Sequence, residues 1–505
     1  MKVYRILVLI IVGLFFCFPA CTIQYAAIGN QSESAQPVPE QTFFESTSIT
    51  NHTLNINGKT LPYTATAGYM PIKDNDGKTI AQIFYISYTR ESNQNIEQRP
   101  ITFAFNGGPG SSSIWLHLGA LGPKRVVLAD DGTIISRSYQ LVDNQYTWLD
   151  FTDLVFVDPV GTGYSRAAEG VNANQFYNMN EDVKIMGEFV RRYVTENQRW
   201  VSPKYITGES YGTTRAVAMA GHMQKEHAMW LKGLVLLSSA LNFETFSFDS
   251  GNDLPYVLAV PSYAAAALYH KKLSGNFMDT MKDASQWAFD DYMPALAKGD
   301  MLEDNERDKI IDKLINYTGI SKSFFDEHRM RISNFQFTNE LLKDSFRVTG
   351  LLDSRVTSIR FPNFFEHAYS DPSLFLVEGP YVSAFNSYVR QDLNFKTDKT
   401  YVFLSDKINE AWTWSQGQQG YVDVSGRLTE AMSADEHLHV FAGTGYYDLT
   451  TPWLSQEYTY SHLALRPELI KNITHKYYES GHQIYTSTPE LEKLTKDVAA
   501  FFQNE

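Results

Sequence analysis

Cysteine is nearly absent from this chain. Only two of its 505 residues are cysteines, Cys17 and Cys21, and both lie at the N-terminal end. The remainder of the chain therefore cannot form an intramolecular disulfide. Hydrophobic residues make up 43% of the sequence and aromatic residues 14%, which suits a large buried core. We expect a globular protein whose stability comes from that core.

Positive charge is scarce as well. The chain has 43 lysines and arginines against 57 aspartates and glutamates, which gives a formal net charge of -14. Proteins that bind nucleic acid neutralise phosphates with clustered basic side chains, and no basic stripe is visible here. We therefore predict that nucleic acid is not a partner.

The N-terminal end carries an apolar run from Ile6 to Phe18, which is too short for a membrane span. Two basic residues precede this run and Pro19-Ala20-Cys21 follows it, which is the order of a secretory signal peptide. We predict a signal peptide over residues 1–21 and export to the periplasm, the medium or the cell envelope. Because Ala20-Cys21 also resembles a bacterial lipoprotein site, lipid on Cys21 is the one membrane anchor that we predict, with plain cleavage as the alternative.

Two further segments precede the predicted buried sheet. Residues 22–42 are predicted to form a flexible tether, because QSESAQPVPEQ from Gln31 is polar and contains prolines. From Thr53 to Tyr88, short β-rich runs alternate with turn signals such as Asn57-Gly58 and Asp76-Gly77. This pattern predicts antiparallel hairpins at the edge of a sheet.

Continuous apolar runs then alternate with helical stretches. Each run is short, rich in β-formers and followed by glycine or acidic residues, as in a parallel sheet buried on both faces. The runs are Ile101 to Phe105, Leu154 to Val157, Tyr205 to Thr207, Leu234 to Leu237 and Val440 to Ala442. We predict an α/β fold.

The pattern changes in the middle of the chain. Between Asp279 and His328 the sequence is rich in charges with spaced apolar residues, which is typical of amphipathic helices. We therefore divide the folded part into a first core segment at 43–242, a mainly helical cap insertion at 243–395, and a second core segment at 396–505.

The stretch TGESYG, Thr207 to Gly212, indicates a nucleophilic serine. A Gly-x-Ser-x-Gly pattern suits the sharp strand-to-helix turn that exposes a serine side chain. Lys204 to Thr207 supplies the incoming strand, and Arg215 to Ala220 supplies the outgoing helix. Ser210 is thus the candidate nucleophile.

A second glycine-rich stretch, FNGGPGSSS from Phe105 to Ser113, follows the first buried run. Glycines let backbone N–H groups approach a substrate oxygen without a β-carbon in the way, which is what an oxyanion hole requires. A tight loop without function is the alternative reading.

Four motifs in order resemble the serine carboxypeptidase family of α/β-hydrolases. They are NGGPGSSS, the stretch NQYTWLDFTDLVFVDPVGTGYS from Asn144, TGESYG and the late Gly481-His482. The likeness runs from about Phe103 to His482, and we identify the chain as a bacterial-type member. The resemblance implies an α/β-hydrolase fold with a mostly parallel sheet flanked by helices and a helical cap insertion.

The resemblance also implies a set of catalytic residues. Ser210 matches the nucleophile, Asp448 in FAGTGYYDLTTPW the aspartate of the triad, and His482 in YESGHQIY the general base and acid. Backbone amides of Gly108 and Tyr211 would form the oxyanion hole. This chemistry requires no metal and no organic cofactor.

In this family the positions of Asn106 and Glu209 help to hold the free C-terminal carboxylate of a peptide substrate. Two carboxyl groups attract one another only when one is protonated, which favours acidic conditions. The chain departs from the family at two nearby positions, with Ala104 in place of a tryptophan and Ala120 in place of a second acid. We hypothesise that His117, Lys124 or Arg125 supplies a compensating positive charge.

Further departures and histidines bear on the site. Family members usually carry alanine before the Gly-His pair and a proline shortly after it, where this chain has Ser480 and Tyr485. His437 and His439 have the spacing of neighbours on one face of a strand, although solvated or core histidines are favoured over metal ligands there.

The leading interpretation is an exported serine-type carboxypeptidase that acts on peptides through an acyl-enzyme. The alternatives are another α/β-hydrolase, such as a proline-releasing aminopeptidase, an esterase or an acyltransferase, and a non-enzymatic envelope protein that reuses the fold. Asn106 and Glu209 argue against the aminopeptidase. The sequence does not indicate an oligomeric state or a side-chain preference.

Overall fold

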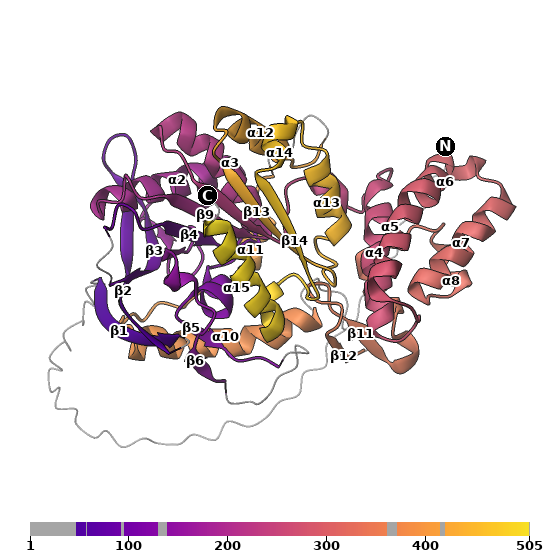
Figure 1. The fold of residues 1–505 in the computed structure, drawn as a ribbon, viewed down its shortest axis with the longest axis horizontal. Helices are drawn as coiled ribbons and strands as arrows, with labels where there is room; N and C mark the ends of the chain where they lie inside the picture. The colour runs from indigo at the N-terminus through magenta and orange to yellow at the C-terminus, as the bar shows by residue number, and fades with distance from the viewer. Residues whose placement is uncertain are drawn as a thin grey trace, which may run out of the picture. The chain divides into compact units, whose positions relative to one another are not determined.

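A ten-stranded, mostly parallel sheet forms the centre of the computed structural model (Figure 1). The predicted signal peptide, Cys21 and the predicted tether lie outside the described residues. The structure describes residues 47–56, 58–91, 95–129, 139–360, 371–414 and 420–503.

The strands follow the order β1-β2-β3-β7-β4-β9-β10-β13-β14, and β8 pairs with β3. The first three strands are antiparallel, and the six from β7 to β14 are parallel to one another. In Figure 1 the antiparallel strands, in indigo, and β14, in yellow, lie at opposite ends of the sheet. The bounds are β1 Ser48–Ile56, β2 Lys59–Lys73, β3 Thr79–Arg90, β4 Ile101–Phe105, β7 Asp153–Val157, β8 Arg166–Ala167, β9 Lys204–Glu209, β10 Gly233–Leu237, β13 His439–Gly445 and β14 Ile473–Tyr478.

The predicted strands are confirmed, with small differences at their ends. Strand β4 matches the predicted run at both ends, whereas β9 continues to Glu209, directly before the candidate nucleophile. The predicted antiparallel edge meander is also present, because Ile56 pairs with Lys59 across a tight turn. The α/β fold with a mostly parallel sheet is therefore confirmed.

Alternating side chains of the strands build a core on each face of the sheet. In β10, Leu234 and Leu236 pack into one cluster, whereas Val235 and Leu237 pack into the other. Successive side chains of a strand point to opposite faces, so strands that are apolar throughout can bury both. Helices must then cover each side of the sheet.

Two groups of helices supply this cover. One cluster contains side chains of α2, α3, α12 and α14, and the other contains side chains of α1, α10, α15 and the π-helical turn η1. Figure 1 shows α2, α3 and α12 near the top and α10 at the bottom. Their bounds are α1 Ile114–Leu116, η1 His117–Leu121, α2 Met179–Glu196, α3 Tyr211–His227, α10 Pro372–Gln391, α12 Ser425–Ala434, α14 Pro467–Ile470 and α15 Thr488–Gln503.

The chain between β10 and β13 is mainly helical. Helix α4 packs against α5 and α7 of this stretch and against α13, which follows β13, and the whole belongs to the same compact unit as the sheet. The bounds are α4 Leu254–Tyr269, α5 Phe277–Trp287, α6 Met293–Lys298, α7 Asp304–Thr318, α8 Lys322–Glu327, α9 Asn334–Glu340, α11 Asp406–Ala411 and α13 Trp453–Ser461, and the stretch also holds the small strand pair β11 Arg347–Thr349 and β12 Thr357–Ile359. A second small strand pair, β5 Lys124–Val126 and β6 Leu141–Asp143, lies between β4 and β7 in the chain.

Short helical turns connect these elements. They are η2 Trp148–Asp150, η3 Ala173–Phe176, η4 Phe243–Phe246, η5 Ala288–Tyr292, η6 Gly299–Met301, η7 Lys343–Ser345 and η9 Ile484–Thr486.

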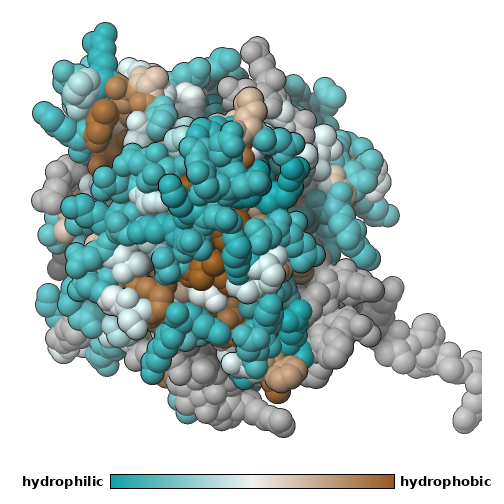
Figure 2. Space-filling model, turned by 90° about the vertical axis from the view of Figure 1, so that its right-hand side faces the viewer, coloured by the Kyte–Doolittle hydropathy of each residue, from teal (hydrophilic) through white to brown (hydrophobic). Residues whose placement is uncertain are grey.

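One face of the molecule is largely hydrophilic. Figure 2 shows one face on which hydrophobic residues, in brown, form separate patches among hydrophilic ones. Isolated exposed side chains such as Met301 and Phe346 are normal on a folded protein. Within the part of the chain that the structure describes, no helix is both long and apolar enough to cross a membrane.

Candidate active site

Ser210 occupies a sharp turn between a strand and a helix. It follows the last residue of β9 and precedes the first residue of α3, with φ +59° and ψ -131°. A positive φ is strained for any residue other than glycine, and such strain is characteristic of functional turns. The N–H and hydroxyl of Thr213 donate to the Ser210 carbonyl at 2.8 and 2.7 Å, which stabilises the turn. The side chain of Ser210 remains partly exposed.

Two glycines allow backbone segments to meet around this turn. A β-carbon at Gly208 would lie 2.2 Å from the carbonyl oxygen of Gly212, and one at Gly107 would lie 2.5 Å from the nitrogen of Tyr211. No side chain fits at either position. The glycine-rich loop after β4 therefore packs directly on the first residue of α3, whose N–H has no partner within the helix. Gly108 in the same loop is exposed.

The end of β10 connects the serine turn to the histidine loop. The Ser210 N–H donates to the Leu237 carbonyl at 3.1 Å. The hydroxyl of the next residue, Ser238, donates to the His482 carbonyl at 2.6 Å. Because Leu237 and Ser238 are adjacent, they hold Ser210 and His482 at the same edge of the sheet, at the carboxyl ends of its parallel strands.

Asp448 is fully buried in the loop after β13 and accepts four hydrogen bonds. Its Oδ1 accepts from the N–H groups of Thr450 and Thr451 at 2.8 and 3.0 Å. Its Oδ2 accepts from the Thr451 hydroxyl and from Nδ1 of His482, both at 2.7 Å. A buried carboxylate with this many donors can hold its charge and fix the orientation of an imidazole.

His482 is 4% exposed and follows β14. Burial lowers its pKa, but the charge and hydrogen bond of Asp448, together with the charges of Glu209 and Asp371, outweigh burial and raise the pKa above its ordinary value. The bond to Nδ1 leaves Nε2 as the nitrogen available for proton transfer. The three residues expected from the sequence, Ser210, Asp448 and His482, thus follow the carboxyl ends of β9, β13 and β14 of the same parallel sheet.

Glu209 and Asn106 form a buried pair beside the serine turn. Asn106 Nδ2 donates to Oε1 of Glu209 at 2.9 Å, and the Leu116 N–H donates to Asn106 Oδ1 at 3.1 Å. Glu209 is 3% exposed, and burial raises its pKa to about 7 against the opposing effects of His482, Tyr485 and Asn106. The structure therefore brings together the two residues expected to bind a carboxylate.

Tyr485 is a neighbour of this pair that the sequence did not reveal. It is 3% exposed, and among the described residues neither its hydroxyl nor Oε2 of Glu209 has a hydrogen-bond partner. The two groups are close enough for Tyr485 to lower the pKa of Glu209, but they are not in hydrogen-bonding geometry. The departure from the family's proline at this position was the available signal.

The hypothesis of a positive charge from His117 is wrong. His117 is 1% exposed, and Nε2 is paired with the Tyr88 hydroxyl at 2.7 Å. Burial lowers the pKa of His117 to about 3, so the imidazole is neutral at any working pH.

The two other candidate cations have partners of their own. Lys124 forms an ion pair with Asp143 at 2.5 Å, and the guanidinium of Arg125 lies 5.9 Å from the centre of the Tyr146 ring. A protonated Glu209, rather than a nearby cation, is therefore the simpler route to binding a carboxylate.

The helical stretch contributes to the histidine loop. The Leu352 carbonyl accepts the His482 N–H at 2.6 Å. Arg355 donates to the Glu479 carbonyl at 2.7 Å and to the Ser480 hydroxyl at 3.3 Å. Ser480, the other departure from the family pattern, thus has a partner that sequence patterns did not indicate.

Two other histidines, His437 and His439, were weighed as metal ligands from the sequence. His437 lies in the turn before β13 and its N–H donates to Asp435, so the expectation that it shares a strand face with His439 is wrong. Across the described ranges, no cluster of three or more histidine, cysteine or acidic side chains could hold a metal ion.

The family model of serine carboxypeptidases matches residues 56–498. "Serine carboxypeptidase-like 10" of Arabidopsis thaliana is 28% identical over 181 residues, covering 35% of this chain and 38% of that protein. "Pheromone-processing carboxypeptidase kex1" of Talaromyces marneffei is 27% identical over 267 residues, covering 50% and 38%. The chain thus spans about two fifths of the length of these curated relatives.

A solved structure shows the same fold. The prohormone-processing carboxypeptidase Kex1(delta)p from Saccharomyces cerevisiae superposes with a TM-score of 0.55 at 14% identity, over 87% of this chain and 91% of that one. These relatives are plant and fungal, so the bacterial-type qualifier stays a prediction. Because the family model covers most of the sequence, the chain belongs to the serine carboxypeptidase family.

Proposed function

We propose that the protein is a serine-type carboxypeptidase that releases C-terminal residues from peptides through an acyl-enzyme intermediate. The observation that carries this proposal is the buried Asn106–Glu209 pair directly beside Ser210. A carboxyl group with a pKa of about 7 is neutral in mildly acidic solution and can then donate to a carboxylate. Such a group beside a nucleophile suits substrates with a free C-terminus.

The acyl transfer uses Ser210, His482 and Asp448. Nε2 of His482 takes the proton from the Ser210 hydroxyl as its oxygen attacks the carbonyl carbon of the last peptide bond. Asp448 stabilises the imidazolium that forms. When the C–N bond breaks, the imidazolium gives its proton to the departing amine, and the peptide remains attached to Ser210 as an ester.

Water then completes the cycle. His482 takes a proton from water, the hydroxide adds to the ester, and the Ser210 oxygen leaves with that proton. In both steps the carbonyl oxygen becomes negative, and the N–H groups of Gly108 and Tyr211 are our candidates to stabilise it. The place of Tyr211 at the first position of α3 and the exposure of Gly108 support this assignment.

The proposal sets the dependence of activity on pH. Glu209 must be neutral to bind a carboxylate, so binding weakens as the pH rises through about 7. His482 must be neutral to accept a proton, so the chemical step weakens as the pH falls below its raised pKa. We therefore expect a bell-shaped profile of kcat/KM against pH. Because the two groups interact, the two limits of the profile belong to the pair and not to either residue alone.

The test uses three matched substrates: an N-blocked dipeptide, its C-terminal amide, and the unblocked peptide. We expect cleavage of the blocked free acid that is much faster than cleavage of the amide and is lost in Ser210→Ala. Cleavage of the unblocked peptide alone would instead indicate an aminopeptidase, and cleavage of simple esters alone another hydrolase. Absence of labelling of Ser210 by a fluorophosphonate would indicate a non-enzymatic protein.

Two further proposals rest on sequence patterns. We propose that residues 243–395 act as a cap on the hydrolase core, with support from their helical character. We also propose that the protein is exported, by the signal pattern over residues 1–21, with lipid anchoring at Cys21 as one form of that export.

A further inference from the structure

Two buried polar atoms beside the serine turn have no partner among the described residues. They are Oε2 of Glu209 and the hydroxyl of Tyr485. Buried polar atoms in folded proteins are almost always hydrogen-bonded, so two neighbouring exceptions require an explanation. Neither atom takes part in the acyl transfer described above.

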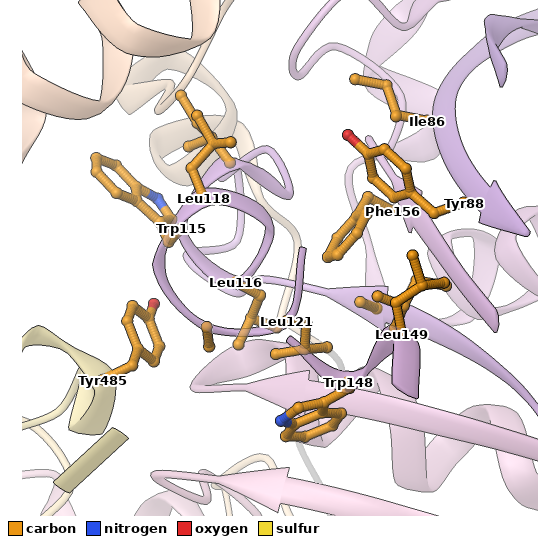
Figure 3. Packing of buried hydrophobic residues seen from close by; sticks show 14 of the residues in the cluster. Ile86, Tyr88, Trp115, Leu116, Leu118, Leu121, Trp148, Leu149, Phe156 and Tyr485 are labelled. Carbon is orange, nitrogen blue, oxygen red and sulfur yellow. The ribbon is translucent and has the colours of Figure 1, made fainter. Parts of the chain in front are cut away.

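The ring of Tyr485 is held in place by its surroundings. It lies in η9, three residues after His482, so one short loop carries both side chains. A β-carbon at Gly119 would lie 2.4 Å from Cε2 of the Tyr485 ring, which shows how closely the ring packs on η1. Figure 3 shows Tyr485 reaching from its own segment toward the turn of Trp115 and Leu116. The hydroxyl therefore has little freedom to move away from Glu209.

The hydrogen bonds of Asn106 determine which oxygen of Glu209 carries a proton. Leu116 donates to Oδ1 of Asn106, so the amide nitrogen faces Glu209 and donates to Oε1. Because Oε1 is an acceptor, neutral Glu209 carries its proton on Oε2. Oε2 is also the oxygen of Glu209 that has no partner among the described residues, as the nearby Tyr485 hydroxyl has none.

We propose that Tyr485 is a positioning residue that aligns Glu209 to bind the C-terminal carboxylate of a peptide, an inference that rests on the function proposed above. A small shift lets the hydroxyl pair with Oε2 and fixes the direction in which neutral Glu209 presents its proton. Without the hydroxyl, the carboxyl group rotates more freely about its bond to Asn106. Peptides with a free C-terminus then lose affinity, whereas substrates without one do not.

The first test compares Tyr485→Phe with the wild-type enzyme on the free acid and on its amide. The variant keeps the ring that packs on Gly119, so the fold is retained. We expect kcat/KM for the free acid to fall by up to about tenfold through KM, the upper range for one hydrogen bond between uncharged groups, with the amide unchanged. Equal losses on both substrates would mean a purely structural role and overturn the proposal.

The second test uses pH. The contact with Tyr485 lowers the pKa of Glu209, so Tyr485→Phe should move the alkaline limit of free-acid cleavage to higher pH. Tyr381→Phe is the matched control, because it removes another buried hydroxyl beside Gly119. We expect no shift in the control. An alkaline limit that stays in place in Tyr485→Phe contradicts the positioning role.

Labelling separates this inference from the proposed function. If the wild-type protein cleaves no free acid, the proposed function fails, but a fluorophosphonate still reports on Ser210. The labelling rate depends on the fraction of His482 that is neutral, and the charge of Glu209 raises the pKa of His482. We expect the labelling rate, plotted against pH, to show a step near pH 7 where Glu209 titrates. A step that moves to higher pH in Tyr485→Phe supports the proposal that Tyr485 positions Glu209, and a step that stays in place overturns the proposal.

Discussion

Two carboxyl groups flank the candidate nucleophile, and their hydrogen bonding differs greatly. Among the residues that the structure describes, Asp448 accepts four hydrogen bonds, whereas Glu209 accepts one, from Asn106. Both groups are almost completely buried, at 0% and 3% exposure. Burial penalises a charged carboxylate unless donors replace the lost water. The same burial therefore suits a charge at Asp448 and a neutral carboxyl at Glu209.

The comparison separates two roles that acids play around one serine. A permanently charged carboxylate can stabilise an imidazolium, but it repels a substrate carboxylate. A carboxyl group that titrates near pH 7 can bind a carboxylate, but it is a poor partner for a cation in acid. The number of hydrogen-bond donors around each carboxyl, more than its depth in the protein, assigns it to one role.

The largest expected effect comes from changing Asp448, the carboxyl group with four hydrogen-bond donors. Asp448→Asn keeps the shape of the side chain but reverses the hydrogen bond to Nδ1 of His482, which stabilises the wrong tautomer. We expect kcat to fall about 10⁴-fold, with KM little changed. Steady-state kinetics on the free acid measures this. A loss smaller than that of Glu209→Gln on the same substrate would contradict the assignment of roles.

Much of this site was predictable from the sequence, because local patterns fix it. The turn at Ser210 is encoded by glycines on either side of it, and the strands before Ser210 and His482 are runs of β-formers. Asp448 follows another such run. Parallel strands bring their carboxyl ends to one edge, so chain order already places these residues together.

Long-range packing was not predictable. Tyr485 meets Gly119 across more than 360 residues of sequence, and Arg355 meets Ser480 across 125. His117 failed as a candidate cation because its charge depends on burial, and no local pattern reveals that a histidine will be sealed beneath Tyr88. Ser480 and Tyr485, the two residues near His482 that differ from the family pattern, both contact residues from distant segments of the chain.

A second prediction concerns stability and tests whether the folded protein favours neutral Glu209, in contrast to Asp448. Burial raises the pKa of Glu209 from 4.5 to about 7, so the folded state favours the neutral form. This contribution is complete below pH 4.5 and is lost as the pH rises through 7. Glu209→Gln cannot ionise and should gain about 3 kcal/mol of unfolding free energy relative to wild type between pH 4 and pH 8.

Urea unfolding of the two proteins across this range measures that gain. Other titrating groups, such as buried Asp158, are common to both proteins and cancel in the difference. Parallel stability curves would mean that Glu209 is charged in the folded protein, and the contrast with Asp448 would disappear.

The smallest expected effect concerns Arg355, which lies next to the loop of His482, the histidine that Asp448 contacts. Its guanidinium pairs with Asp353 at 2.7 Å and also binds the loop that carries His482. Arg355→Met should loosen this loop and lower kcat about tenfold, with the rate of Ser210 labelling reduced in parallel and partly restored in Arg355→Lys.

The matched control for this prediction is Arg331→Met. Arg331 pairs with Asp253 at 2.6 Å in the same helical stretch, among residues that do not contact the histidine loop. Arg355→Met leaves the buried Asp353 without its partner and Arg331→Met the partly buried Asp253, so both should lose stability. Because Arg355 donates to the loop of His482, only Arg355→Met of the two variants should slow labelling at a pH and temperature where both are folded. Equal labelling rates in the two variants would mean that Arg355 does not support His482. The support of the imidazole would then be limited to Asp448 and its four donors.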